Sequence, residues 1–456
     1  MTKTSTKKLT LEQVSGAFTE KFKRSAELGE IGDPYVPRGY SRNILNFGPQ
    51  AIFVESGDGQ YITTVEGHTL LDLHNCFSAS VVGHNHTRVT KAIQDMTVRG
   101  FSFGNPMAHE AELARILCER IRSVEKVIFS CSASESAMSA LRIARANTGK
   151  NRIAKFEGGY HGMADEFMMS LHPFPEQYPG PAHNPVGVPN SAGIPKSTSE
   201  DVVILPQNDI ENCTRILQDN AADLACVIIE LQTAAGGVVV MEKPFIQALR
   251  QITSELGIIL VIDETVTLRA NYHGMQELYD IDPDLTVMGK MIGGGLPIGA
   301  VGGKASLFEM STAGLVYHAG THHGHPMATA AGAACLEVMD EGAYARLNGY
   351  GDRIKTELGG WARSKNLPFI IYGVGSHLGY EISTERKEDY KSCRDMLNYS
   401  NEEYMQIFAF ELANRGIYPM FRGQIALSEP MNEDDISNFI QTSKDILEGM
   451  FIGITK

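Results

Sequence analysis

The sequence lacks several features that would each assign it to a specialised class of protein. Its seven cysteines form no Cys-x-x-Cys pair, and an odd number in a chain of 456 residues argues against a disulfide framework. No run of about 18 apolar residues occurs, so we expect no membrane span. Positive charge is in deficit, since 40 basic against 54 acidic residues leave a net charge of −14. That balance disfavours nucleic acid and anionic membrane surfaces as partners.

The remaining bulk properties are those of an ordinary globular enzyme. Hydrophobic residues make up 43% of the chain, which is enough to bury a sizeable core. The length predicts two or three structural units. Lysines near the N-terminus are not followed by an apolar stretch, so we expect no secretory signal. Together with reduced thiols, this predicts a cytoplasmic location.

Short apolar runs alternate with segments of helical periodicity through the middle of the chain. Residues 137–146 and 245–256 have the helical pattern. This alternation predicts parallel βα units and an α/β fold. The strand candidates are residues 127–129, 153–156, 202–205, 226–229, 258–262 and 285–288.

Three other segments carry structural expectations. The spacing of apolar residues predicts one amphipathic helix over residues 11–28. Residues 173–195 contain seven prolines and predict a long irregular loop, either a wall over a pocket or a surface excursion. The polar stretch 384–395 predicts a solvated loop.

Two charged residues stand where apolar strands end. Asp263 follows the run 258–262, and Lys290 follows the run 285–288 and precedes three consecutive glycines that begin at Gly293. In an open α/β sheet such ends open onto the ligand crevice. A lysine there can form a Schiff base with an aldehyde, and an aspartate can pair with a pyridinium nitrogen. These are the two anchors of pyridoxal phosphate. The alternative is a solvated lysine, which the apolar and glycine-rich flanks disfavour.

Three further segments could bind a ligand. Ser132 to Ser134 precede a helix, where they can bind a phosphate or simply cap the helix. Tyr160 follows the strand 153–156 and can stack on a flat ring or pack as a half-buried residue. Thr321 follows a glycine and suits a phosphate ligand. No carboxylate is evident near the histidines around it, so we expect no metal site. Those histidines are His318, His322, His323 and His325.

Taken in order, these motifs resemble the class III (ω-type) aminotransferases of pyridoxal-phosphate fold type I, from about Gly39 to the C-terminal helix. The resemblance implies a large domain with a mostly parallel seven-stranded sheet and a small α+β domain built from both termini. The domains implied are residues 1–75 and 326–456 for the small parts, with residues 76–325 as the large cofactor-binding domain.

The resemblance also implies a role for each motif residue. Lys290 would be the catalytic Schiff-base lysine, Asp263 would face the ring nitrogen and Tyr160 would stack on the ring. Thr321 would reach the phosphate of a neighbouring subunit, which implies a homodimer with shared active sites. Two departures are Ala133-Ser134 where the family has Gly-Thr, and Leu231 where most members have proline. The other cofactor-binding residues implied are Ser132, Ala133, Ser134, His161, Glu230 and Thr265.

Within the family, residues 265–269 lack the Gly-Phe of many members and resemble the branch of β-phenylalanine aminotransferases and glutamate-1-semialdehyde aminomutase. Arg42 and Arg422 fall where that branch places substrate-carboxylate arginines; the alternative is that both are surface residues. Two guanidinium groups favour an aminotransferase that moves an amino group from a β- or ω-amino acid to 2-oxoglutarate or pyruvate. The alternatives are a 2,1-aminomutase and a non-catalytic protein of the same fold.

Overall fold

The computed structural model describes residues 8–172 and 180–452, and these fall into two compact units. The first unit is drawn from residues 1–86, 346–389 and 399–456, and the second from residues 87–345 and 390–398. The first unit therefore contains both ends of the chain. The domain boundaries expected at residues 75 and 325 stay a prediction.

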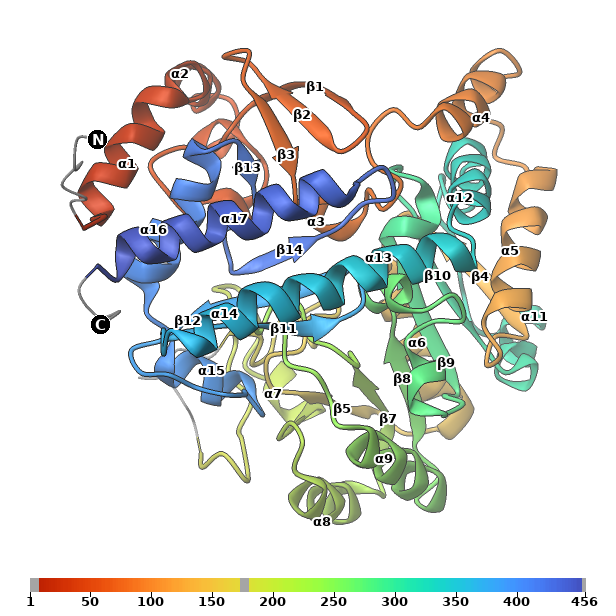
Figure 1. Cartoon of the computed structure of the whole chain (residues 1–456). Coiled ribbons are helices and arrows are strands. Elements are labelled where there is room, and N and C mark those ends of the chain that lie inside the picture. Colours follow the sequence, from red (N-terminus) through yellow and green to blue (C-terminus); the bar gives the residue numbers. More distant parts are fainter. Residues whose placement is uncertain (1–7, 173–179, 453–456) are drawn as a thin grey trace, which may run out of the picture. The chain divides into compact units, whose positions relative to one another are not determined.

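A seven-stranded sheet forms the centre of the second unit (Figure 1). Neighbouring strands are parallel except β10, which is antiparallel to both β4 and β9. The predicted mostly parallel seven-stranded sheet is thus confirmed. In spatial order its strands are β4 Lys126–Ser130, β10 Gly299–Gly303, β9 Leu285–Gly289, β8 Ile259–Asp263, β7 Leu224–Ile229, β5 Arg152–Phe156 and β6 Val202–Leu205.

The strand that the sequence did not predict is β10. It reads Gly-Ala-Val-Gly-Gly, which has little β propensity. A Cβ at Gly299 would lie 2.1 Å from the carbonyl oxygen of Ser132. Glycine is therefore required there, because the backbone at the end of β4 approaches the strand closely.

Helices surround the sheet, and α6 (Ala133–Thr148) lies across β10, β9 and β7. Ser132 and Glu135 form a capping box at its start, and Gly149 ends it at φ 69°. Its apolar face joins the strands in the main hydrophobic core. The other helices that begin in this unit are α4 Thr87–Thr97, α5 Ala108–Arg120, α7 Thr198–Asp201, α8 Ile210–Asn220, α9 Lys243–Glu255, α10 Gln276–Tyr279, α11 Glu309–Thr312, α12 Pro326–Val338, α13 Glu341–Ile354 and α15 Cys393–Tyr399.

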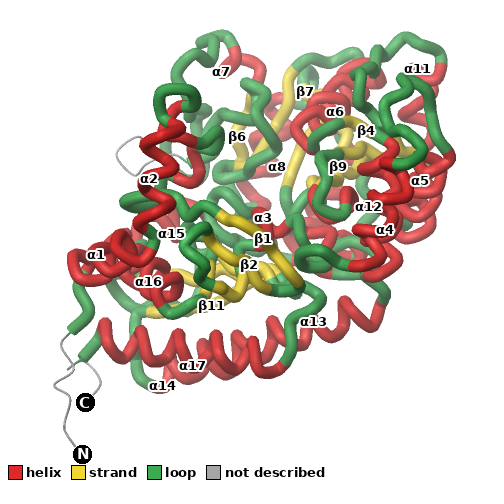
Figure 2. The backbone as a smooth tube through the Cα atoms, turned by 90° about the horizontal axis from the view of Figure 1, so that it is seen from above, coloured by secondary structure: helices red, strands yellow, loops and turns green. Residues whose placement is uncertain are grey.

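The first unit brings the two ends of the chain together. Strand β13 (Ile417–Tyr418) pairs in parallel with β3 (Thr69–Asp72), and α1 (Leu11–Lys21) lies beside α16 (Glu402–Asn414) in Figures 1 and 2. This confirms a small α+β part built from both termini. Its remaining elements are α2 Lys23–Gly32, β1 Val54–Asp58, β2 Tyr61–Thr64, α3 Asn75–Ser78, α14 Gly360–Ser364, β11 Phe369–Val374, β12 His377–Ile382, β14 Gln424–Ala426 and α17 Glu433–Met450.

One local prediction was wrong and another holds only in part. The single helix expected over residues 11–28 is two helices that meet at Phe22, whose backbone leaves the helical region and whose ring is fully buried against Phe18. The solvated loop expected over residues 384–395 is exposed or half-exposed over residues 384–389, but its end is buried. Arg394 there forms two hydrogen bonds with Glu157, of 2.6 and 2.9 Å, and the ion pair replaces the water that both charges lose.

The proline-rich stretch is irregular as predicted where the structure describes it, from residue 180 onward, and residues 173–179 lie outside the described part. Whether it forms a wall over a pocket stays a prediction. Among the described residues, no helix combines the length and the apolar character needed to cross a bilayer.

Candidate active site

The predicted cofactor residues follow the carboxyl ends of five strands of the second unit. Ser132 follows β4, Tyr160 follows β5, and Glu230 follows β7. Asp263 ends β8, and Lys290 follows β9. Since the carboxyl ends of parallel strands form the ligand crevice of an open sheet, the fold gathers these residues at one edge.

Asp263 is almost fully buried, with 3% of its surface exposed, and two donors hold its carboxylate. The backbone N–H of Thr265 donates to Oδ1 at 3.0 Å, and His161 Nδ1 lies 2.9 Å from Oδ2. Burial lowers the pKa of His161, so the ring is neutral near pH 7 and its Nδ1–H donates to the carboxyl group of Asp263. The two donors do not use all the lone pairs of the Asp263 oxygens, so Asp263 can also face a cation.

Glu230 lies under the same edge of the sheet and accepts a 2.9 Å hydrogen bond from the backbone N–H of Tyr160. Burial and the charge of Asp263 raise the pKa of Glu230 to about 8, while the charges of Lys290 and Lys155 oppose the rise. Glu230 is therefore largely protonated near pH 7. It fixes the start of the Tyr160 segment without adding a second full negative charge beside Asp263.

Lys290 stands at the point where the backbone turns sharply away from the sheet. Its φ is +54°, in the left-handed region that a residue with a Cβ seldom occupies. Met291 and Ile292 directly after it are buried and anchor the turn, while the lysine itself is half-buried. The left-handed backbone holds Lys290 at the end of β9, and its role as the Schiff-base lysine stays a prediction.

The turn before α6 has the form of a phosphate site. Ser132 is the N-cap of a helix of 16 residues that begins at Ala133, and its side chain accepts a hydrogen bond from the N–H of Glu135. Ala133 carries a Cβ where the family has glycine. A Cβ at Gly289 would lie 2.9 Å from it, so the glycine at 289 provides the space that the extra methyl group needs.

The residues present fit pyridoxal phosphate. Two buried side-chain atoms, Thr265 Oγ1 and His161 Nε2, have no hydrogen-bond partner among the described residues, and Thr265 borders the same turn. A held carboxylate, a half-buried amine and a helix N-terminus match the three charged or reactive parts of the cofactor: ring nitrogen, aldehyde and phosphate. The individual roles stay predictions.

The two predicted substrate arginines lie in the first unit, and both are exposed. A ladder of aromatic rings connects their segments. Phe47 stacks on Phe421 with ring centres 3.7 Å apart, and Phe421 contacts Tyr418, which stacks on His74. Burial lowers the pKa of His74 to about 4, and the positive charge of Arg42 contributes to this shift. The fold thus brings Arg42 and Arg422 to neighbouring segments although they lie far apart in sequence.

Thr321 is exposed on a turn of the second unit in which the N–H of His323 donates to the carbonyl of Gly320. An exposed hydroxyl is compatible with a ligand held by another subunit. The role of Thr321 at the phosphate of a neighbouring subunit stays a prediction.

Sequence reasoning missed Lys155. It is fully buried in β5, its Nζ donates to the carbonyl of Met169 at 2.6 Å, and burial lowers its pKa to about 8. Its charge acts on Glu230 and His161. The signal was a lone lysine within an otherwise apolar strand, which is rarely a solvated residue.

Comparison with known proteins places this geometry in a family. The family model described as "Aminotransferase class-III" matches residues 45–421 of this chain. Glutamate-1-semialdehyde 2,1-aminomutase 2 of Brevibacillus brevis is 34% identical over 94% of this chain and 99% of that protein. An ω-transaminase from Sphaerobacter thermophilus is 32% identical, with a TM-score of 0.87 over 93% of this chain and 97% of that one. A β-phenylalanine aminotransferase from Variovorax paradoxus is 27% identical, with a TM-score of 0.88 over 96% and 97%.

These relatives include both enzymes of the branch that the sequence resembled, and they confirm the resemblance and the cofactor. The curated relatives bear the aminomutase name, which was the alternative to the predicted transamination. The chain therefore belongs to the class III aminotransferases and is a pyridoxal-phosphate-dependent enzyme.

Proposed function

We propose that this enzyme moves the amino group of glutamate-1-semialdehyde between carbons 2 and 1, as a 2,1-aminomutase. The observation that supports this most strongly is the relative so named, which is 34% identical over nearly the full length of both proteins. This reverses the order of our two predictions from the sequence.

The bound cofactor supplies an aldehyde and an electron-withdrawing ring. The chain's own residues would do the rest. Asp263, held by Thr265 and His161, would pair with the protonated ring nitrogen. Ser132, Ala133 and Ser134 would bind the phosphate at the start of α6.

Lys290 Nζ would hold and move the reacting proton. It lies on a strained turn beside Glu230 and Asp263. As a general base and then an acid, it would take a proton from the amino-bearing carbon of the substrate and return it on the neighbouring position. The protonated Glu230 would keep this region from gaining excess negative charge.

Arg42 would bind the substrate carboxylate through two parallel N–H donors. The segment carrying it is fixed because Phe47, five residues on, stacks on Phe421. An isomerisation that keeps one carboxylate on one carbon skeleton needs one such arginine.

Transamination is the second candidate, and two observations favour it. Solved structures similar to this chain include the ω-transaminase and the β-phenylalanine aminotransferase. Arg422 stands beside the Arg42 segment as a second guanidinium, which suits an enzyme that must accept two different acids in turn. The donor would be a β- or ω-amino acid and the acceptor 2-oxoglutarate or pyruvate.

One experiment separates the two candidates. The purified enzyme with its cofactor is incubated with glutamate-1-semialdehyde and no keto acid, and in parallel with a β-amino acid and 2-oxoglutarate. Formation of the 1-amino isomer in the first reaction, with little glutamate in the second, supports the aminomutase. Glutamate in the second reaction alone overturns it in favour of transamination.

A homodimer in the cytoplasm is the assembly and location we propose. Large apolar side chains are exposed on the second unit, including Val98 at 85%, Leu315 at 73% and Tyr317 at 75%. An apolar set of this size favours burial against a second copy. Light scattering should give twice the chain mass of 49.9 kDa. A monomer at micromolar concentration would contradict the dimer.

A further inference from the structure

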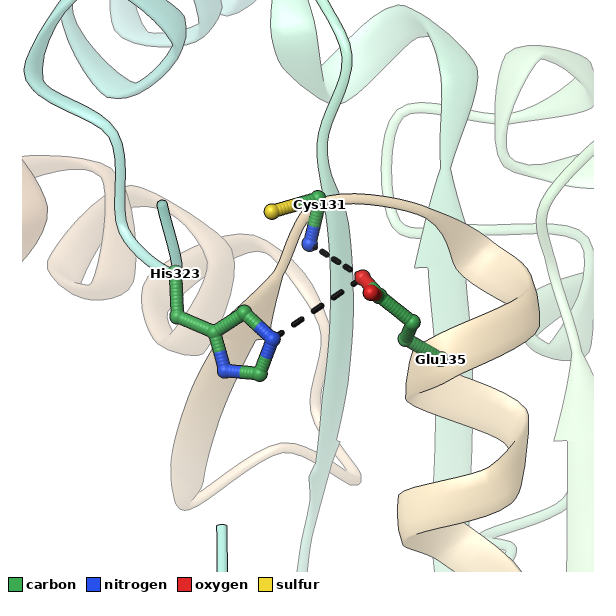
Figure 3. Close-up of side chains that lie close together, drawn as sticks. All are labelled: Cys131, Glu135 and His323. Atoms are coloured by element: carbon green, nitrogen blue, oxygen red, sulfur yellow. Dashed lines mark hydrogen bonds and ion pairs between the residues drawn. The ribbon is translucent and has the colours of Figure 1, made fainter. Parts of the chain in front are cut away.

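Three side chains with metal-binding atoms meet beside the first turn of α6. Cys131 Sγ, a carboxylate oxygen of Glu135 and a ring nitrogen of His323 all lie within 4.8 Å of one another (Figure 3). Cys131 and Glu135 flank the start of the helix, and His323 comes from a turn much later in the chain. We propose that these three residues form a binding site for a transition-metal ion of the Zn²⁺ type.

The donor set matches the ion. Thiolate sulfur, imidazole nitrogen and carboxylate oxygen are the ligands that Zn²⁺ takes in proteins, and three of them leave a fourth position for water. Bond lengths of about 2.0–2.3 Å place the donors of a tetrahedral site roughly 3.3–3.8 Å apart. The widest separation in the cluster must therefore close by about 1 Å. Small rotations allow this, because all three side chains are partly exposed.

His323 is prepared to act as a ligand. Burial lowers the pKa of His323, and the neighbouring His318 adds a smaller effect in the same direction. The neutral ring offers a lone pair to a metal ion. Its Nε2 lies 3.8 Å from Glu135 Oε2, and its Nδ1 is buried without a partner among the described residues. A Cβ at Gly320 would lie 2.3 Å from Nε2, so the glycine makes room for the ring in this position.

His318 is not a fourth ligand, because both its nitrogens are engaged. Its Nε2 lies 2.7 Å from the carbonyl of Phe129, and its Nδ1 lies 3.2 Å from the hydroxyl of Ser139. These bonds hold His318 beside His323, with ring centres 4.6 Å apart. His318 thus supports the position of the ligand ring.

Glu135 can bind an ion without leaving the capping box. Its Oε2 accepts from the backbone N–H groups of Cys131 at 2.7 Å and Ser132 at 3.1 Å. The same Oε2 lies 3.8 Å from His323 Nε2, so the carboxylate would keep its backbone donors while it binds the ion. The carboxylate would connect the helix start to the ion, as outer hydrogen bonds orient ligands in metal sites.

Cys131 supplies the sulfur of the set. Burial and the charge of Glu135 raise the pKa of the Cys131 thiol, while a hydrogen bond from the backbone of His322 lowers it. Binding of a metal ion would displace the thiol proton into solvent.

The predicted absence of metal rested on the lack of a carboxylate near the histidines. In the fold, Glu135 supplies it, together with Cys131. A bound ion would join the turn that carries Thr321 to the helix start that carries Ser132 to Ser134. The site is distinct from Lys290 and does not depend on the proposed reaction.

Cobalt titration tests the site. Untagged holoenzyme is treated with a chelator, dialysed and titrated with Co²⁺, which substitutes for Zn²⁺ and reports its ligands by absorbance. We expect one equivalent to bind with the intense visible bands of four-coordination and with thiolate-to-cobalt charge transfer. Cys131→Ser should abolish the charge transfer, and His323→Gln should weaken binding at least tenfold. Glu135→Gln keeps a side chain that can cap the helix, and it should also weaken cobalt binding at least tenfold.

Two variants serve as matched controls. Cys118→Ser removes another partly buried thiol of the second unit, and His325→Gln removes a histidine two residues from the proposed ligand. Both should bind cobalt as the unaltered enzyme does. Charge transfer that persists in Cys131→Ser, or the absence of stoichiometric binding at micromolar cobalt, would overturn the site. Because the readout is metal absorbance, its failure leaves the proposed amino-group reaction untouched.

Discussion

His161 Nδ1 lies 2.9 Å from Asp263 Oδ2, with both side chains buried at the carboxyl edge of the seven-stranded sheet. A buried carboxylate keeps its charge only where donors or cations surround it. His161 is the side-chain donor, and the backbone N–H of Thr265 is the other. The histidine therefore orients Asp263 toward the ring nitrogen that we expect it to meet.

Replacing His161 should weaken cofactor binding. His161→Phe removes the donor from Oδ2, and a hydrogen bond to a charged group contributes about 1.5–3 kcal/mol. The dissociation constant for pyridoxal phosphate should increase about 10- to 150-fold, as measured by loss of cofactor absorbance on dialysis. His161→Asn retains a donor at a similar position and should recover part of the loss. Equal affinity in His161→Phe and the unaltered enzyme would rule out the orienting role.

Lys290→Ala should abolish turnover while the protein stays folded. General acid–base transfer by a placed side chain contributes about 10²–10⁴-fold, and the expected loss is at least that large. Alanine meets the left-handed backbone at 290 with no more strain than lysine, so the melting temperature should change little. Lys365→Ala, at an exposed position, is the control. Near-normal rates in Lys290→Ala would exclude the lysine from the chemistry.

The two arginines should respond differently to truncation. Arg42→Ala should raise KM for the semialdehyde about 10- to 100-fold, because a charge-assisted clamp on the carboxylate is lost. Arg422→Ala should change isomerisation by less than about threefold and reduce any transamination of 2-oxoglutarate much more. Steady-state kinetics with both substrates measures this. Equal losses in both reactions from Arg422→Ala would refute its assignment to a second acid.

Stability should depend on pH through Glu381 in the first unit. Burial raises the pKa of Glu381 to about 7 from an ordinary 4.5. Between these values the folded protein keeps a proton that the unfolded chain releases, so this carboxyl's contribution to stability falls as pH rises and is lost above about 7. Glu381→Gln removes the dependence. The free energy of unfolding of Glu381→Gln should exceed that of the unaltered protein by almost nothing at pH 4.5 and by about 3 kcal/mol at pH 8.

Unfolding of both proteins at pH 5 and pH 8 tests this sign. Glu448→Gln, at an exposed position of α17, controls for loss of a carboxylate as such. A constant difference between Glu381→Gln and the unaltered protein across this range would show that Glu381 does not titrate as described.

Elements with a strong local signal were predictable from sequence. Six of the seven sheet strands contain apolar runs, and the residues at their carboxyl ends, Asp263 and Lys290 among them, share one edge because parallel strands point the same way. Strand β10 could not be assigned, since its glycines reflect the close approach of neighbouring segments, such as Ser132 at Gly299 and Asp284 at Gly303, rather than β propensity.

Contacts between distant segments were not predictable. Nothing in the local sequence around His323 indicates that Glu135 and Cys131 lie beside it, since the pairing depends on how two turns meet. The same holds for Arg394, a polar residue in a polar stretch, which is buried because it pairs with Glu157 in the second unit. The ion pair allows Arg394 and Glu157 to be buried, although each charged side chain alone would favour the surface.

The most direct test of the whole account is to locate the covalent link to the cofactor. Holoenzyme is reduced with borohydride, digested, and its peptides mapped by mass spectrometry. The account predicts a single pyridoxyl group, on Lys290. A label on another lysine, such as the buried Lys155, or no label in protein that retains its cofactor, would contradict it.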